Sequence, residues 1–126
     1  MDNFNKISSL LSQHFEVNLN IFTAIPCEPQ DKSVLKAKNV VEKLDPMALL
    51  CLYEAAMLTK SSAISLCLLH DHLSLSEAVS SARVDEDAQI AKYGKVDGAH
   101  DIEEAKLRAT LSAAYDIVKL CRQRNE

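Results

Sequence analysis

Residues Ser74–Asp101, with the sequence SLSEAVSSARVDEDAQIAKYGKVDGAHD, decide how the second half of this chain is interpreted. The stretch opens with a Ser-x-x-Glu capping box, in which Ser74 and Glu77 satisfy the first free amides of a helix. Apolar residues then recur at steps of three and four, which predicts one helix over Leu75–Tyr93 and a left-handed C-cap at Gly94. The residues of this apolar stripe are Leu75, Val79, Ala82, Ile90 and Tyr93.

One position breaks the apolar spacing of this predicted helix. Where the stripe calls for an apolar residue the sequence has Glu86, flanked by Asp85 and Asp87. Three consecutive carboxylates spread around most of a helix, so at least one must face inward or into a groove. An unpaired buried carboxylate is costly, so we expect Glu86 to have a cationic or amide partner. The alternatives are a partly solvated ion pair with Arg83 or Lys60, or an acidic site that faces another molecule.

The composition predicts a mainly α-helical, single domain. The chain has 126 residues, of which 48% are hydrophobic and 25% charged, enough for one core. Its two glycines and three prolines favour long helices over a sheet with many turns. A net charge of -4 argues against nucleic acid as the main ligand. Because no apolar run approaches the about 20 residues that span a bilayer, we expect a soluble protein without membrane insertion.

The remaining segments predict a bundle of five to six helices with one short β-strand near the N-terminus. We expect helices over about 5–14 and 31–43, separated by residues 15–25, where apolar residues alternate with polar ones as in a strand. A single strand cannot form a sheet, so it must pair elsewhere in the chain, lie across helices or complete a sheet of another domain or chain.

The second half predicts the hydrophobic centre of the bundle. Asp45 as N-cap and Pro46 at the first helical position are expected to open a central helix that is apolar on nearly every side. A second apolar helix should follow over about 63–70. The loop after Tyr93 holds both glycines, Gly94 and Gly98, which indicates a particular turn geometry before Asp101 caps the last helix.

Motifs for catalysis or metal binding are weak. The four cysteines show no C-x-x-C spacing and are interpreted as small buried hydrophobes of a reducing compartment. His70-Asp71-His72 lacks a third ligand, and His100-Asp101 is interpreted as loop and cap residues instead of an acid/base pair. No phosphate-binding loop or nucleophile motif is present. We therefore predict no metal, no cofactor and no enzymatic activity.

Two segments, LDPMALLCLYEAAMLTKSSAISLCLLHDHLSLSEAVSSAR and VDEDAQIAKYGKVDGAHD, resemble a known family. They are similar to the C-terminal helical domain of the ATP synthase assembly chaperones that bind the alpha subunit of the catalytic sector. The resemblance covers about residues 15–114. Its matching positions are Leu44-Asp45-Pro46, Leu73-Ser74, Arg83, Asp85-Glu86-Asp87, Gln89, Tyr93-Gly94 and Gly98-Ala99-His100-Asp101.

The chain departs from the pattern of this family in two respects. Tyr93 replaces the usual tryptophan, and Ala88 replaces a large aromatic residue. Both changes would alter the packing behind Asp85-Glu86-Asp87, the acidic turn. Members of the family also carry an N-terminal β-rich domain, which is absent from residues 1–126. The chain is thus expected to be the helical domain alone, either as an isolated piece or as a shortened relative, with the strand over 15–25 at the interface to the missing domain.

The resemblance implies a non-catalytic chaperone that binds the unassembled alpha subunit and prevents its aggregation before it pairs with the beta subunit. It further implies a monomer in the mitochondrial matrix, or in the cytoplasm if the source is bacterial. The expected partner-binding residues are Glu86 first, then Asp85, Asp87 and Gln89, with Arg83 orienting them. The expected structural residues are Asp45, Pro46, Ser74, Glu77, Tyr93, Gly94, Gly98, His100 and Asp101. A general helical adaptor or scaffold is the alternative, and a small enzyme with a pocket around His100 is a third hypothesis.

Overall fold

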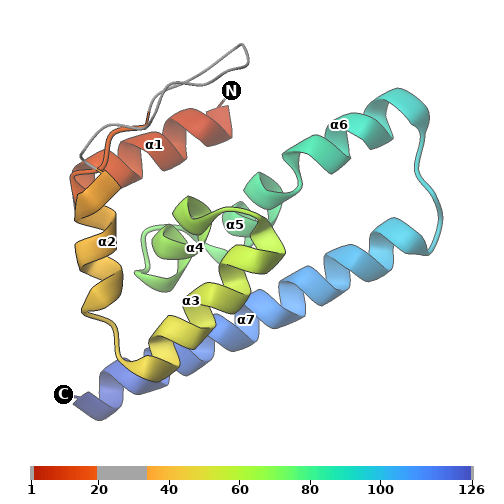
Figure 1. The fold of residues 1–126 in the computed structure, drawn as a ribbon. Coiled ribbons are helices and arrows are strands. Elements are labelled where there is room, and N and C mark those ends of the chain that lie inside the picture. Colours follow the sequence, from red (N-terminus) through yellow and green to blue (C-terminus); the bar gives the residue numbers. More distant parts are fainter. Residues whose placement is uncertain (1, 20–33, 126) are drawn as a thin grey trace. The chain divides into compact units, whose positions relative to one another are not determined.

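The computed structural model describes residues 2–19 and 34–125 of the chain, which form seven α-helices and no β-strand (Figure 1). The prediction of a mainly α fold is confirmed. The chain consists of two compact units, Met1–Asp45 and Pro46–Glu126.

The first unit contains helices α1 (Asp2–Phe15) and α2 (Val34–Glu42). The apolar spacing of α1 places Ile7, Leu11 and Phe15 on one buried face. Lys36 of α2 forms an ion pair of 2.8 Å with Glu16, which directly follows α1. The helix expected over 31–43 is present from Val34, and residues 31–33 lie outside the described part of the chain.

The strand predicted over residues 15–25 is wrong where the structure describes it. Phe15 is the last residue of α1, and residues 16–19 belong to no strand. Glu16 has a φ of 56°, and the Val17 amide donates to the Leu11 carbonyl at 3.1 Å, so the chain turns back over the helix end. The alternating burial of Phe15 and Val17 therefore comes from a helix terminus instead of a pleated strand. The rest of the predicted strand lies outside the described residues.

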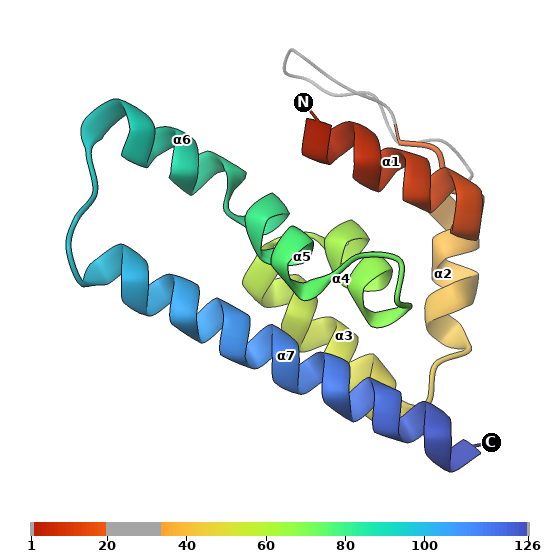
Figure 2. The same cartoon turned by 180° about the vertical axis from the view of Figure 1, so that it is seen from behind.

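The second unit contains five helices: α3 (Pro46–Thr59), α4 (Ser62–Leu69), α5 (Leu75–Ala82), α6 (Val84–Tyr93) and α7 (Ala99–Asn125). The long α7 packs along α3 and also contacts α4 and α5 (Figures 1 and 2). Both views show α6 leading away from α5, and an extended loop that connects the end of α6 to the start of α7. This loop and the first turn of α7 place the residues of the candidate site.

The most buried helix of the second unit is α4, not the longer α3 that precedes it. All residues from Ile64 to Leu69 are buried. In α3 one side is buried through Ala48, Cys51, Leu52 and Ala55, whereas Leu50, Tyr53 and Met57 on another side are exposed. The sequence predicts both helices as apolar, but burial depends on which faces find a partner.

Helix starts follow the local chemistry that the sequence predicts. The Ser74 hydroxyl accepts from the Glu77 amide at 3.2 Å, and the Glu77 carboxylate accepts from the Ser74 amide at 3.1 Å, which completes the capping box. Pro46 opens α3 directly after Asp45, at the position where its missing amide costs nothing. The start of α4 has a cap that was not predicted: the hydroxyl of Ser61 accepts from the Ile64 amide at 3.2 Å.

Three expectations about helix ends are wrong. The helix predicted over Leu75–Tyr93 is broken at Arg83, which closes α5 and precedes α6. Gly94 has a φ of 88° and a ψ of 161°, a conformation open essentially to glycine alone but not the left-handed helical one. Helix α7 begins at Ala99, so Asp101 lies in its first turn, where its charge suits the helix dipole, and is not the N-cap.

Among the cysteines, Cys51 and Cys67 are buried and Cys121 is half-buried, and all three are free thiols. Burial raises the pKa of the Cys67 thiol to about 11, so this thiol stays neutral at pH 7. These positions agree with small buried hydrophobes, and Cys27 lies outside the described residues. None of the helices in residues 2–19 and 34–125 combines the length and the apolar character needed to cross a membrane.

Candidate partner-binding site

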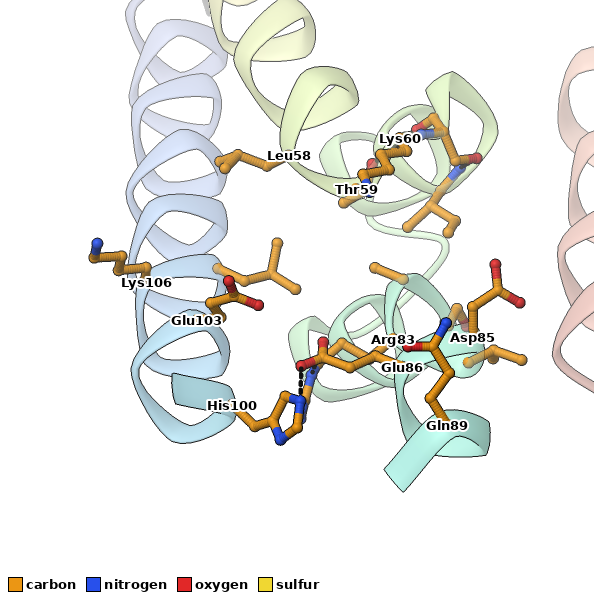
Figure 3. Close-up of a pocket in the computed structure, with 16 residues that line it drawn as sticks. Leu58, Thr59, Lys60, Arg83, Asp85, Glu86, Gln89, His100, Glu103 and Lys106 are labelled. Carbon is orange, nitrogen blue, oxygen red and sulfur yellow. Dashed lines mark hydrogen bonds and ion pairs between the residues drawn. The ribbon is translucent and has the colours of Figure 1, made fainter. Parts of the chain in front are cut away.

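A cleft of about 870 Å³ opens in the second unit between α6, the start of α7 and the junction of α3 with α4 (Figure 3). Its walls are part apolar and part charged. The lining residues are Leu58, Thr59, Lys60, Ser61, Ile64, Ser81, Ala82, Arg83, Val84, Asp85, Glu86, Gln89, His100, Glu103, Lys106 and Leu107.

The helix break at Arg83 positions one wall of this cleft. Ala78 and Val79 of α5 are buried, whereas α6 buries none of its own residues. The apolar stripe predicted for one continuous helix is therefore covered in its first half and largely uncovered in its second. Glu86 lies in the first turn of α6, just beyond the break, together with Asp85 and Asp87.

Arg83 is the centre of an ion-pair network at the base of the cleft. Its side chain is about 10% exposed, and its Nε donates to Glu86 Oε2 at 3.2 Å. Its Nη1 donates to Glu104 Oε2 of α7 at 2.5 Å, and its Nη2 lies 3.8 Å from Asp87 Oδ1. The hydrogen bond to Glu86 raises the pKa of the Arg83 guanidinium, against the effect of burial. The expectation that Arg83 orients the acidic turn agrees with this geometry.

Only one of the two carboxylate oxygens of Glu86 has a hydrogen-bond partner in this network. Its side chain is 25% exposed, and its Oε2 accepts from Arg83. Its Oε1 is buried and has no hydrogen-bond partner among the residues that the structure describes. His100 Nε2 lies 3.9 Å from this oxygen, beyond hydrogen-bond distance. Glu86 therefore has the expected partner in Arg83 and still presents one unmet acceptor.

His100 is fixed on the opposite wall by the loop that precedes α7. Its Nδ1 accepts a hydrogen bond from the Val96 amide at 3.0 Å, which assigns the hydrogen of the neutral ring to Nε2. This nitrogen is the one that faces Glu86 (Figure 3). His100 thus belongs to the site, although the sequence suggests a structural loop residue.

The remaining predicted partner-binding residues divide into two groups. Asp85 and Gln89 line the cleft with Glu86, whereas Asp87 is exposed and belongs to the Arg83 network only. Tyr93 is 77% exposed, and the Lys92 ammonium lies over its ring at 5.1 Å, so Tyr93 does not pack behind the acidic turn. Contact of Asp85, Asp87 and Gln89 with a partner stays a prediction.

Gly98 and Asp101 shape the connection beside the site. Gly98 has a φ of 86°, which favours glycine, and it precedes the first residue of α7. Asp101 pairs with Lys95 across the loop, and the hydrogen bond from Lys95 lowers the pKa of the Asp101 carboxyl. Both residues thus lie at this connection, but Asp101 acts there as an ion-pair partner and not as the helix cap that the sequence predicts.

The residues that sequence reasoning missed lie mainly on α7. Glu104 binds Arg83 from 21 positions away, and Glu103 and Leu107 line the cleft. Leu107 is part of the buried stripe of α7, and residues three and four positions before it lie on the same side of a helix. This spacing could have pointed to Glu103 and Glu104, but no sequence pattern joins them to Arg83.

The His70-Asp71-His72 segment has a structural role at the end of α4. His70 Nδ1 lies 2.9 Å from the Leu66 carbonyl, and Asp71 accepts from the Tyr115 hydroxyl and from Arg122 of α7. Within residues 2–19 and 34–125, no group of three or more His, Cys, Asp or Glu residues is placed to hold a metal ion.

Comparison with known proteins relates the fold to bacterial proteins that include a candidate chaperone. No family model matches the chain. The crystal structure of Atp12 from Paracoccus denitrificans superposes with a TM-score of 0.84 over 94% of this chain and 51% of that one, at 22% identity. The Atu1473 protein of Agrobacterium tumefaciens, described as a candidate chaperone, superposes with a TM-score of 0.82 over 94% of this chain and 44% of that one, at 21% identity.

These similarities establish a shared fold. They agree with the resemblance that the sequence shows, because the matched structures include Atp12, of which a point mutant also superposes with a TM-score of 0.84. The chain spans about half the length of the Atp12 structures.

Proposed function

We propose that this chain is a chaperone domain for assembly of the ATP synthase catalytic sector. The observation that carries the proposal is the match of its fold to the Atp12 structures over 94% of its length. The sequence resemblance to the assembly chaperones covers much of the same region and includes the acidic turn at Glu86. The proposed role is binding, without catalysis.

The proposed partner is the free alpha subunit, held until it pairs with the beta subunit. A protein that prevents aggregation must cover apolar surface and still release it, which suits an interface with an apolar centre and a charged rim. The cleft offers apolar side chains at Leu58, Ile64 and Leu107 next to the acidic groups of α6. On this proposal the chain acts as a monomer in the mitochondrial matrix, or in a bacterial cytoplasm.

The proposed contact residues are Glu86, Asp85 and Gln89 in the cleft, with Asp87 at its edge and Arg83 as the residue that positions Glu86. The side chain of Arg83 is nearly buried and engaged with three carboxylates, so it supports the site from behind. Glu86 is the first candidate because part of its carboxylate has no partner within the described residues.

The test is a pull-down and a light-scattering assay with free ATP synthase alpha subunit. The chain is compared with its Glu86→Ala variant and with Glu54→Ala, a control at an exposed glutamate of α3 outside the cleft. We expect the unaltered chain and Glu54→Ala to bind the alpha subunit and suppress its aggregation, and Glu86→Ala to lose most of both effects. Binding that is equal in all three would remove the site from the proposal, and no binding in any would remove the function.

A general helical adaptor remains the second candidate because α3 exposes an apolar face. Leu50, Tyr53 and Met57 are 53%, 58% and 63% exposed on this helix. Such a face suits the apolar side of another helix. An adaptor of this kind would lose its binding on Tyr53→Ser and keep it on Glu86→Ala, the reverse of the chaperone proposal.

A further inference from the structure

The half of the apolar stripe that lies on α6 is left largely uncovered within the described part of the second unit. Val84 is 43% and Tyr93 77% exposed, and Ile90 between them is partly exposed. The same stripe is buried in α5 at Val79. Apolar side chains at helical spacing that find no cover within their own unit fit the apolar side of a partner segment.

The charged groups of the cleft are unevenly satisfied. Glu86 Oε1 is buried without a hydrogen-bond partner among the described residues, a state that costs free energy until a donor reaches it. Asp85 and Glu103 line the same cleft from α6 and α7, and neither forms an ion pair within the part of the chain that the structure describes. Three carboxylates on two different helices thus offer acceptors to a molecule in the cleft.

The two lysines of the lining do not neutralise this end of the cleft. Figure 3 shows Lys60 at the opposite end from Glu86 and His100, beside Thr59. The same view shows the Lys106 side chain pointing outward from α7, away from Glu86. The end of the cleft at Glu86 is therefore acidic beyond what Arg83 compensates.

We infer that the cleft takes a guanidinium group from the partner, an arginine side chain within an apolar segment of the bound protein. This inference rests on the proposed function and specifies the chemistry of its partner. The arginine pairs with the carboxylates at this end of the cleft, and its neighbours cover the apolar face of α6. Because Glu86 Oε1 is buried, the side chains around it must shift for the guanidinium to reach this oxygen. The unmet acceptor calls for a donor, and the surrounding carboxylates favour a donor that is cationic.

A guanidinium fits better than an ammonium for two reasons. Its planar fork carries five donors, so one group can bridge carboxylates on different helices, as Arg83 does with Glu86 and Glu104. It is also more weakly hydrated, which lowers the cost of entering a partly apolar cleft. An ammonium would bind as a point charge and leave more of the acceptors unmet.

The test is arginine footprinting of the complex with the free ATP synthase alpha subunit. Alpha subunit is treated with phenylglyoxal, which modifies arginine, in the presence of the unaltered chain, Glu86→Gln, Glu103→Gln or the control Asp116→Asn at an exposed acid of α7 outside the cleft. Mass spectrometry then locates the protected arginines. Glu86→Gln removes the charge but keeps an oxygen that accepts from Arg83. Glu103 is exposed. We therefore expect both variants to fold, so that a lost protection reports on binding.

We expect one arginine of the alpha subunit to be protected by the unaltered chain and by Asp116→Asn. Glu86→Gln should abolish the protection and weaken binding about tenfold, and Glu103→Gln should reduce both. Binding without any Glu86-dependent arginine protection, or with protection of lysines from acetylation instead, would overturn the guanidinium inference and leave the proposed function in place. If no complex forms with any variant, the proposed function fails and this inference fails with it.

Discussion

Arg83 and Glu104 are 21 residues apart in the sequence, yet Nη1 of the guanidinium donates to Oε2 of the carboxylate at 2.5 Å. This bond joins the break between α5 and α6 to the first turns of α7. The same guanidinium holds Glu86 through Nε, so the position of the acidic turn depends on α7. The site is therefore a product of tertiary structure, although its most acidic part is continuous in the sequence.

Replacement of Arg83 should destabilise the second unit and displace Glu86. Arg83→Ala leaves Glu86 and Glu104 without their cation, so we expect the free energy of unfolding to fall. The loss should be limited to roughly 1–3 kcal/mol, because both carboxylates are partly solvated. Arg83→Lys keeps the charge and loses the fork, so its effect should be intermediate. Urea denaturation followed by circular dichroism measures both. An unchanged midpoint for Arg83→Ala would show that the network adds no stability.

The buried stripe of α7 should dominate the stability of the second unit. Leu111 is 0% exposed, and Leu111→Ala should lower the free energy of unfolding by about 2–5 kcal/mol through the lost contacts and the cavity that remains. Leu120 on the same helix is 64% exposed, and the matched change Leu120→Ala should cost less than about 0.5 kcal/mol. Thermal and urea unfolding give the comparison. Equal effects at the two positions would mean that α7 is not packed as described.

Local chemistry explains the features that the sequence could predict. The capping box of Ser74 and Glu77 and the proline start of α3 depend on residues within one helical turn, so their patterns are sufficient. The mainly α fold follows from long apolar stripes and few glycines. Glu86 could be singled out because a carboxylate on an apolar stripe requires a partner wherever the helix lies.

The features that the sequence could not predict depend on distant contacts. Arg83 is a good helix former, and no glycine or proline lies beside it. Nothing local therefore predicts that the helix breaks at Arg83, where its side chain contacts the distant Glu104. The alternation at Phe15 and Val17 imitates a strand because a helix end and the turn after it bury every second residue there. Likewise, α3 and α4 are equally apolar, and packing alone decides that α4 is the more buried.

The contact between Tyr115 and Asp71 should be visible in a pH titration. The hydrogen bond to Asp71 raises the pKa of the Tyr115 phenol, so the folded protein holds this proton more tightly than the unfolded chain. The stabilisation is complete below the usual tyrosine pKa and is lost as pH rises through the raised value. The ultraviolet titration curve of the Tyr115→Phe variant, subtracted from that of the unaltered chain, gives the titration of this phenol alone. Asp71→Asn should lower the midpoint, and the same midpoint in both proteins would exclude the contact in solution.

The conformation of Gly94 should control α6 without controlling the core. Its φ of 88° and ψ of 161° are strained for any other residue, so Gly94→Ala should cost about 1–3 kcal/mol, although no atom beyond the two adjoining residues lies within 4 Å of the added methyl group. Because α6 buries none of its residues, the chain can relieve this strain by shifting or fraying α6 instead of unfolding.

Hydrogen exchange with mass spectrometry distinguishes these two responses. We expect amides of α6 to exchange faster in Gly94→Ala while those of α4 and the centre of α7 stay protected, with weaker binding of the alpha subunit. Val96→Ala is the control, because Val96 lies in the same loop without a positive φ and is 60% exposed. Uniformly faster exchange throughout the second unit would mean that α6 unfolds together with the core, and the acidic turn would then be part of one rigid body with α4 and α7.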